Sequence, residues 1–279
     1  MELFERRARL AAGLRVVRRG RDHLQIGLYD ERRVLLPRTQ DVEQVLAALA
    51  EGAPVGNDPD HASVLEGLQR TGCVVWDQPP RAVRPAVAVL GRLEVPGLPD
   101  LDGLLRASGV AVTPSIDSAQ VVLVLSVGEL DRDRLDPLIR SRTAHLVVRL
   151  VDGGAVIGPF VAPGATACLR CIDAHLSVRD PDHVAVTARY VRATARPRAD
   201  GMPDLDPALT SLTLVWALRD VVAHLAGAEP SSWSRTVHLG PDPSQHASHT
   251  WLRHPQCGCC WPVDVGAAGE GGNSRVWAV

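Results

Sequence analysis

The sequence predicts an α/β protein of two domains, a winged-helix-like module over residues 1–80 and a Rossmann-like domain over residues 81–279. Three observations lead to this fold class. Short β-type runs followed by helical periodicity fill the first part of the chain. A proline-rich segment at residues 78–85 has the composition of a linker. Beyond it, buried strands alternate with helices, which is the order that builds a largely parallel sheet.

The first domain combines short strands with two helices. Leu24, Ile26 and Leu28 alternate with other residues, so one face of the small sheet is packed and the other is not. Thr39 is a candidate N-cap of the first helix, and Gly72 ends the second. Together these elements make a winged-helix-like module. The expected strands are residues 14–18, 23–29, 32–36 and 73–76, and the expected helices carry apolar residues at 42, 45, 46 and 49, then at 64, 65 and 68.

The second domain follows the order β-α-β-β-α-β of a Rossmann-like sheet. Gly153 and Gly154 are typical of a hairpin turn between two of its strands. One late helix is apolar around much of its circumference, which predicts that it is buried. The expected strands are residues 86–90, 110–113, 121–126, 145–151, 155–160, 235–239 and 249–252, and the expected helices are residues 101–107, 130–142 and 207–226.

Composition narrows the classes of function. The net charge of −2 argues against a nucleic-acid binder that works through bulk charge. The chain has no lysine, which excludes a phosphate-loop lysine or a Schiff base. Its first residues lack the pattern of a signal peptide, and no apolar stretch approaches the roughly 20 residues of a membrane helix. We therefore expect a cytoplasmic protein without a membrane partner, in a reducing compartment.

A Rossmann-like sheet that binds a nucleotide has a glycine-rich turn after its first strand, and this turn binds the phosphate. Here Gly91 and Gly97 are separated by five bulky residues, and Glu94 between them would repel a phosphate. The next strand ends in Thr-Pro where an acidic ribose ligand would stand, and Asp117 further on is a weak substitute. We therefore expect that the nucleotide site is eroded and that ATP is not a cofactor.

Five cysteines stand in two groups separated by 85 residues. Thiolates two residues apart can share one metal, and four thiolates satisfy the tetrahedral preference of Zn²⁺. Because such a set leaves no open coordination position, we expect a structural zinc rather than a catalytic one. A disulfide or buried free thiols are the alternatives, and His254 could replace one thiolate. The candidate ligands are Cys168 and Cys171, then Cys257, with the fourth ligand open between Cys259 and Cys260.

The run Gly-Pro-Phe-Val-Ala-Pro-Gly-Ala-Thr-Ala-Cys-Leu-Arg-Cys at residues 158–171, with His-Pro-Gln-Cys-Gly-Cys at residues 254–259, resembles the ThiF-like partner proteins of azole-forming peptide maturation. Proteins of this family join a leader-recognition element to a ThiF-like domain that has often lost adenylation. They deliver a ribosomal precursor peptide to a YcaO cyclodehydratase. The resemblance covers almost the whole chain. It implies leader recognition by residues 1–80, a degenerate ThiF-like domain with a zinc clasp at residues 81–279, and Cys259 as fourth ligand, and it leaves room for a homodimer.

The resemblance implies that the first domain binds an extended leader segment, which adds as a further strand to the small sheet. By topology the accepting edge is the last strand of the small sheet, whose arginines could pair with acidic leader residues. The alternative is that the apolar residues only pack the core and the arginines are solvated. The alternative function is an ATP-dependent adenylating enzyme acting on a peptide or carrier-protein carboxylate. The candidate peptide-binding residues are Arg32, Arg33, Val34, Leu35 and Leu36 on the strand and Val64, Leu65, Leu68 and Gln69 on the facing helix.

Overall fold

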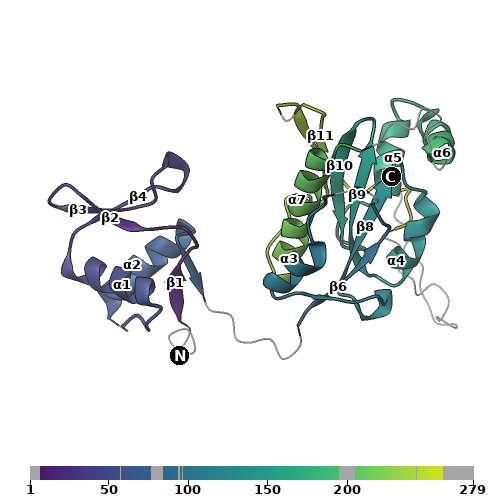
Figure 1. Cartoon of the computed structure of the whole chain (residues 1–279). Coiled ribbons are helices and arrows are strands. Elements are labelled where there is room, and N and C mark those ends of the chain that lie inside the picture. Colours follow the sequence, from purple (N-terminus) through teal and green to yellow (C-terminus); the bar gives the residue numbers. More distant parts are fainter. Residues whose placement is uncertain are drawn as a thin grey trace, which may run out of the picture. The chain divides into compact units, whose positions relative to one another are not determined.

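The computed structural model describes residues 7–56, 58–76, 84–93, 95, 97–194, 205–242 and 244–259. The chain divides into two compact units, Met1–Ala82 and Val83–Val279, which are called unit 1 and unit 2 below (Figure 1). Each unit has its own core and carries its own candidate site.

Unit 1 combines two small antiparallel sheets with two helices in its described residues. Strands β2, β3 and β4 form one sheet in that order, so β2 and β4 are its edges, and β1 pairs with β5. Thr39 caps α1 as predicted, because its side chain accepts a hydrogen bond from Val42 N. The elements are β1 (Ala8–Leu10), β2 (Val16–Arg19), β3 (His23–Ile26), the 3-10 helix η1 (Asp30–Arg32), β4 (Val34–Pro37), α1 (Gln40–Glu51), α2 (Pro59–Arg70) and β5 (Val74–Trp76).

The core of unit 1 contains residues of the three-stranded sheet and of both helices. The strand register pairs Leu24 with Leu36 and Ile26 with Val34; Leu24 and Ile26 are buried in this core, and Val34 and Leu36 pack against it. Because side chains alternate between the faces of a strand, Leu35 points to the opposite face, where it is 47% exposed. One face of the sheet is therefore packed and the other is open to solvent.

The loop between β3 and β4 differs from the expectation. β3 ends at Ile26 rather than at Tyr29, and Leu28 and Tyr29 are 73% and 75% exposed in the loop. Gly27 has φ 75°, and a Cβ on it would lie 2.3 Å from Arg32 O, so the chain turns there and no larger residue fits. The strand β1 was not anticipated, because it is defined by its pairing with β5, far along the chain. The winged-helix-like classification of unit 1 stays a prediction.

Unit 2 is built on one mixed sheet with the strand order β12-β11-β10-β9-β8-β6-β7 in its described residues. Pairing is parallel from β7 to β9 and antiparallel from β9 to β12. The parallel pairing predicted for the β-α-β-β-α-β segment is therefore confirmed for β6 to β9, and β10 runs antiparallel to β9 across the predicted hairpin, whose tight turn lies at Asp152 and Gly153. The antiparallel addition of β11 and β12 was not predicted. The strands are β6 (Ala86–Leu90), β7 (Ala111–Val112), β8 (Val121–Val127), β9 (Ala144–Val151), β10 (Gly154–Val161), β11 (Arg235–Leu239) and β12 (His246–Thr250).

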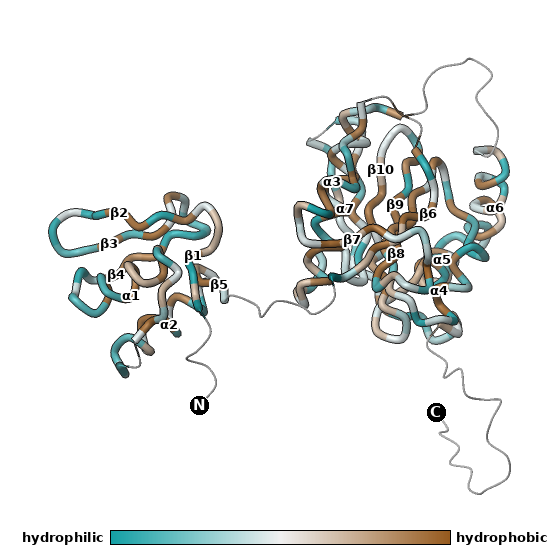
Figure 2. Tube along the Cα trace, turned by 60° about the horizontal axis from the view of Figure 1, so that its bottom comes forward, coloured by the Kyte–Doolittle hydropathy of each residue, from teal (hydrophilic) through white to brown (hydrophobic). Residues whose placement is uncertain are grey.

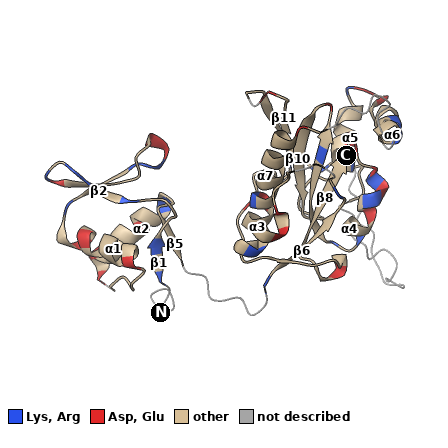
Figure 3. Cartoon of the chain, viewed as in Figure 1, with Lys and Arg blue, Asp and Glu red and all other residues tan. Residues whose placement is uncertain are grey.

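Helices cover both faces of this sheet (Figure 1). On one face, Leu105 of α3 and Leu214 of α7 join Leu146 of β9 in a buried cluster. On the other face, Leu138 of α4 and Leu169 of α5 pack against the sheet. Hydrophobic residues follow the strands in Figure 2, and charged residues are rare on them in Figure 3. The helical elements are α3 (Leu101–Ala107), η2 (Ile116–Ser118), η3 (Arg132–Leu135), α4 (Asp136–Arg140), α5 (Leu169–Ser177), α6 (His183–Thr194) and α7 (Pro207–Leu225).

Two helical segments depart from the predictions. The helix expected at residues 130–142 is split into η3 and α4, because Pro137 lacks a backbone N–H and is tolerated only in a first helical turn. The helix α7 is long and apolar enough to cross a membrane, so the expectation that no stretch approaches that length is wrong for this segment. In unit 2, α7 packs on β8, β9 and β10, which is the placement of a core helix.

Candidate functional site

The edge strand β4 is the first candidate site. Within the described residues of its sheet, β4 pairs only with β3 and leaves its other side open. Leu35 on this strand is 47% exposed, and Leu28 and Tyr29 before it are 73% and 75% exposed. An open strand edge beside exposed apolar side chains is what a peptide uses when it adds a strand to a sheet.

The register shows which backbone groups of β4 face outward. Arg38 N donates a hydrogen bond to Asp22 O at 2.8 Å, directly beyond the last residue pair of β3 and β4. Bonded and non-bonded pairs alternate along an antiparallel ladder, so Val34 and Leu36 bond to β3. By the same alternation, Leu35 directs its N–H and its C=O to the open edge. A single residue therefore offers both a donor and an acceptor to an incoming strand.

The two arginines of the predicted edge lie outside β4. Arg32 ends η1 and donates to Gly72 O at 3.5 Å, beyond the end of α2. Arg33 follows η1 and forms an ion pair of 2.8 Å with Asp30. Both arginines are exposed, so their charge remains accessible to a partner.

The four residues predicted to bind peptide on α2 differ in how far they are buried. Leu65 and Leu68 are 8% and 1% exposed and belong to the core of unit 1, as in the core-packing alternative. Val64 is half-buried against this core, and Gln69 is exposed. The open part of the predicted surface is therefore on β4 and not on the buried face of α2.

Four cysteines from two distant segments meet at the start of α5. Cys168 and Cys171 are buried, and Cys257 and Cys259 reach them from the end of the described chain. All four sulfurs lie within 4.8 Å of one another, and the Cys168–Cys257 and Cys171–Cys259 pairs are 3.4 Å apart. Zn–S bonds of about 2.3 Å give a thiolate tetrahedron with edges of about 3.8 Å, so four thiols at this spacing could bind a metal. No disulfide joins them.

The alternative ligands are placed differently. The Nδ1 atom of His254 accepts a hydrogen bond from Gln256 N at 3.3 Å, and His254 is not part of the four-sulfur cluster. Cys260 lies outside the described residues. Hydrogen bonding to Cys168 lowers the pKa of Cys171 and Cys257, and hydrogen bonding among the same thiols raises the pKa of Cys168 and Cys259. The thiolate is the form that binds a metal, so metal binding would release the protons that these thiols hold.

The turn after β6 shows why Gly91 is a glycine. Its φ is 91°, and a Cβ on it would lie 2.1 Å from Leu125 O, so this glycine allows the chain to pass close to β8. The next helix, α3, is capped by Asp100, whose side chain accepts from Gly103 N at 3.0 Å. An acidic cap occupies the helix end that a phosphate would need and repels it. Glu94 lies outside the described residues.

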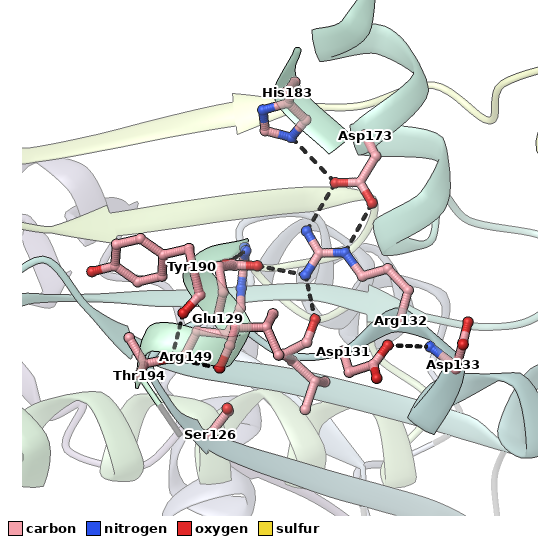
Figure 4. A network of polar contacts seen from close by, with 12 residues as sticks. Ser126, Glu129, Asp131, Arg132, Asp133, Arg149, Asp173, His183, Tyr190 and Thr194 are labelled. Atoms are coloured by element: carbon pink, nitrogen blue, oxygen red, sulfur yellow. Dashed lines mark hydrogen bonds and ion pairs between the residues drawn. The ribbon is translucent and has the colours of Figure 1, made fainter. Parts of the chain in front are cut away.

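A buried polar network lies at the end of β8 in unit 2 (Figure 4). Arg132 donates two parallel hydrogen bonds of 2.8 Å to Asp173, from Nε and Nη2, and its Nη1 donates to Glu129. Arg149 on β9 donates from Nη1 to the other oxygen of Glu129. The side chains of these four residues are only 10–13% exposed. His183 on α6 lies 3.3 Å from Asp173 and extends the network.

The two arginines of this network differ in how well their charge is compensated. Burial alone would lower the pKa of Arg132, but hydrogen bonds and attraction from Asp173 and Glu129 raise it above its usual range. Burial lowers the pKa of Arg149, and the attraction of Glu129 does not make up for it. Arg149 Nε is buried without a hydrogen-bond partner in the part of the chain that the structure describes. Arg149 is therefore the less satisfied of the two cations.

This network forms one wall of a cavity of about 670 Å³. Residues of α5 and α6 line one side of it and residues of β9, β10, β11 and β12 line the other. The Tyr190 hydroxyl of α6 donates to Asp152 at 2.6 Å and ties the helix to the turn after β9. The volume lies within the range of small-molecule sites.

No family model and no curated protein matches the chain. Solved structures do. The heterocyclase TruD superposes with a TM-score of 0.61 at 18% identity, over 91% of this chain and 43% of that one. A heterocyclase in complex with substrate and cofactor gives 0.63 and 18%, over 91% and 39%. MccB from E. coli gives 0.57 and 13%, over 96% and 99%.

The chain shares the fold of TruD and MccB. The mixed α/β architecture with one large sheet is thus similar to that of these two structures. The chain spans less than half the length of the two heterocyclases but almost all of MccB. At identities of 13–18% the likeness shows the fold, and the function depends on the residues of the sites.

No sequence pattern predicted the polar network or the cavity. A signal was present in Arg149, which lies inside a strand whose other residues read as buried. A buried cation needs a counter-charge, so its presence predicts an acidic partner nearby. The partner Glu129 lies 20 positions away along the chain, and only the parallel pairing of β8 with β9 brings the two together.

Proposed function

We propose that the chain binds the leader segment of a ribosomal precursor peptide and presents the peptide to a partner modifying enzyme of the YcaO cyclodehydratase type. The observation that carries this proposal is the open edge of β4, where Leu35 is 47% exposed and directs its backbone groups outward. An extended leader added there would gain main-chain hydrogen bonds for affinity and side-chain contacts for specificity.

Exposed apolar side chains favour β4 over the other edge strand. Leu28, Tyr29 and Leu35 are exposed on or just before β4, whereas Val17 is the large exposed apolar residue that β2 contributes in the described residues. The exposed Arg33 pairs with the exposed Asp30, an exchangeable contact that an acidic leader residue could replace. Affinity would thus come from β4 and its loop, and charge selection from the arginines before it.

The fold likeness supports a role in the maturation of ribosomal peptides. One structural neighbour is a heterocyclase in complex with substrate and cofactor, and MccB has been solved with MccA. This chain covers 43% of TruD, and the proposal gives the modifying step to a partner. We assign that role to a YcaO-type partner in the cytoplasm, and a homodimer is compatible with it.

We assign a structural zinc to Cys168, Cys171, Cys257 and Cys259. The metal would join the start of α5 to the end of the described chain. Cys171 and Cys257, which belong to these two segments, are 86 positions apart in the sequence. A closed set of four thiolates leaves no coordination position for a substrate, so the zinc would support the fold of unit 2 and take no part in chemistry.

Strand addition is tested by two matched proline variants. Leu35→Pro removes the outward N–H of β4 and leaves the β3–β4 ladder intact. Arg18→Pro is the control, because Val17 pairs with Gln25 and the alternation directs the N–H of Arg18 to the opposite free edge of the sheet. Fluorescence polarisation with labelled leader peptides encoded nearby should show binding lost in Leu35→Pro and kept in Arg18→Pro.

Two results would contradict the proposal. Unchanged leader binding by a folded Leu35→Pro variant, with folding checked by circular dichroism, would eliminate the β4 edge as the binding site. Clear ATP binding in calorimetry, together with ATP–pyrophosphate exchange, would favour the alternative of an adenylating enzyme over a non-catalytic partner.

A further inference from the structure

Arg132 and Arg149 both donate a hydrogen bond from Nη1 to Glu129. They differ in the contacts that the other side of the guanidinium group makes. Arg132 places its Nε and Nη2 on the two oxygens of Asp173, both at 2.8 Å. The Nη1 of Arg149 donates a hydrogen bond to Glu129, and its Nε has no hydrogen-bond partner in the described residues. The Nε edge of Arg149 therefore lacks the acceptor that the same edge of Arg132 has. The same fork geometry suits a carboxylate from outside the chain.

The position of Arg149 makes this edge relevant to a ligand. Its side chain is 10% exposed and lines the cavity between α5, α6 and strands β9 to β12. The other lining residues are largely apolar or aromatic, among them Val156, Ile172, Leu176 and Trp251. A cavity with apolar walls and one unsatisfied cation suits a ligand that has an apolar body and a single anionic group.

The charge around the cavity limits the ligand to few negative charges. Glu129 and Asp173 already balance Arg132 and Arg149, and Asp152 adds a third carboxylate to the lining, so the cavity has no excess of positive charge. A single carboxylate would satisfy the Nε edge of Arg149, whereas a triphosphate would bring several charges beside two buried carboxylates. A carboxylate is therefore favoured over a nucleotide at this position.

We propose that the cavity of unit 2 binds a carboxylate group attached to an apolar body, and that the guanidinium of Arg149 receives the carboxylate. The helix α6, which has no buried residue of its own, covers the bound ligand. This site is distinct from the β4 edge and does not depend on leader capture. The carboxylate can belong to a free small acid or to an acidic side chain of a peptide, and the experiment separates these sources.

Calorimetry on the full chain tests the charge requirement with matched probes. Hydrocinnamate and hydrocinnamamide form one pair, and N-acetyl-Leu-Asp-amide and N-acetyl-Leu-Asn-amide form the other. Each pair differs only in the charge of one group. The carboxylate of at least one pair should bind about tenfold or more tightly than its amide, as expected for charge-assisted hydrogen bonds. The pair that shows the difference identifies the source. Equal binding of acid and amide in both pairs, or no binding, overturns the proposal.

Variants locate the site. Arg149→Met should weaken binding of the carboxylate about tenfold and leave binding of the amide unchanged. Because Arg149 is buried and its loss can affect folding, Thr187→Trp provides an independent test by filling the cavity from α6. Ala185→Trp on the exposed side of the same helix, outside the cavity lining, is its matched control. Loss of binding in Thr187→Trp with retention in Ala185→Trp supports the site, and retention in both overturns it.

Discussion

Replacing His145 with leucine should change how the stability of unit 2 depends on pH. His145 lies in β9 and is 0% exposed. Its Nδ1–H donates to Thr143 O at 2.9 Å, and its Nε2 has no partner in the part of the chain that the structure describes. Protonation would place an uncompensated charge in a buried site. Burial therefore lowers the pKa of His145 from 6.5 to about 4.

Linkage between protonation and folding sets the sign and size of the effect. Above pH 6.5 the ring is neutral in both the folded and the unfolded chain, and the contribution of His145 to stability is fully present. Between pH 6.5 and about 4 the unfolded chain binds a proton that the folded chain does not, so stability falls as the pH falls. At 1.36 kcal/mol for each pH unit, the loss over this window is about 3 kcal/mol. His145→Leu removes this loss.

Urea unfolding followed by tryptophan fluorescence measures the effect at several pH values from about 7.5 down to about 4. The unfolding free energy of His145→Leu, relative to the wild type, should rise by about 3 kcal/mol over that range. Replacing the exposed His246 by leucine controls for the loss of a histidine as such. Parallel pH profiles of the wild type and His145→Leu would refute the reasoning, because they would mean that His145 has the same pKa in the folded and the unfolded chain.

Three further predictions concern the metal, the polar network and the turn after β6. Elemental analysis should show that Cys259→Ser loses bound zinc while Cys260→Ser keeps it; the reverse pattern would make Cys260 the ligand. Arg132→Gln leaves the buried Asp173 without its cation and Glu129 with Arg149 alone, and should lower the unfolding free energy by about 3–5 kcal/mol, part of which the added change Asp173→Asn restores. No recovery in the double variant would show that the two residues are not coupled. Gly91→Ala should destabilise unit 2 by about 1–3 kcal/mol in thermal unfolding, and an unchanged midpoint would rule out the close approach to β8.

Local patterns predicted the elements that local chemistry decides. The strand Ala86–Leu90, the helix Leu101–Ala107 and the strand Arg235–Leu239 have the predicted bounds. Each is marked by its own periodicity and by flanking turn residues, so no distant partner is needed to recognise it. The strand Ala8–Leu10 gave no such signal, because it is defined by its pairing with Val74–Trp76 far along the chain.

The candidate sites divide in the same way. The spacing of the cysteines indicated a metal site, and the strand pattern indicated an edge that could accept a peptide. The sequence could not tell that Leu65 and Leu68 face the core or that Arg32 ends a 3-10 helix, because both facts depend on how the chain turns at Gly27 and packs on α2. The network of Arg132 and its partners gave no sequence motif at all.

The sequence by itself determined the alternation of strands and helices, the division at the proline-rich linker and the set of thiols available to a metal. Periodicity, capping and turn residues act over a few positions, so they can be read along the chain. Only the tertiary structure decided the mixed order of the large sheet, the convergence of Cys257 and Cys259 on α5, and the cavity with Arg149 in its wall. Those features depend on which distant segments pair and pack, and side chains that share a buried site need not be neighbours in sequence.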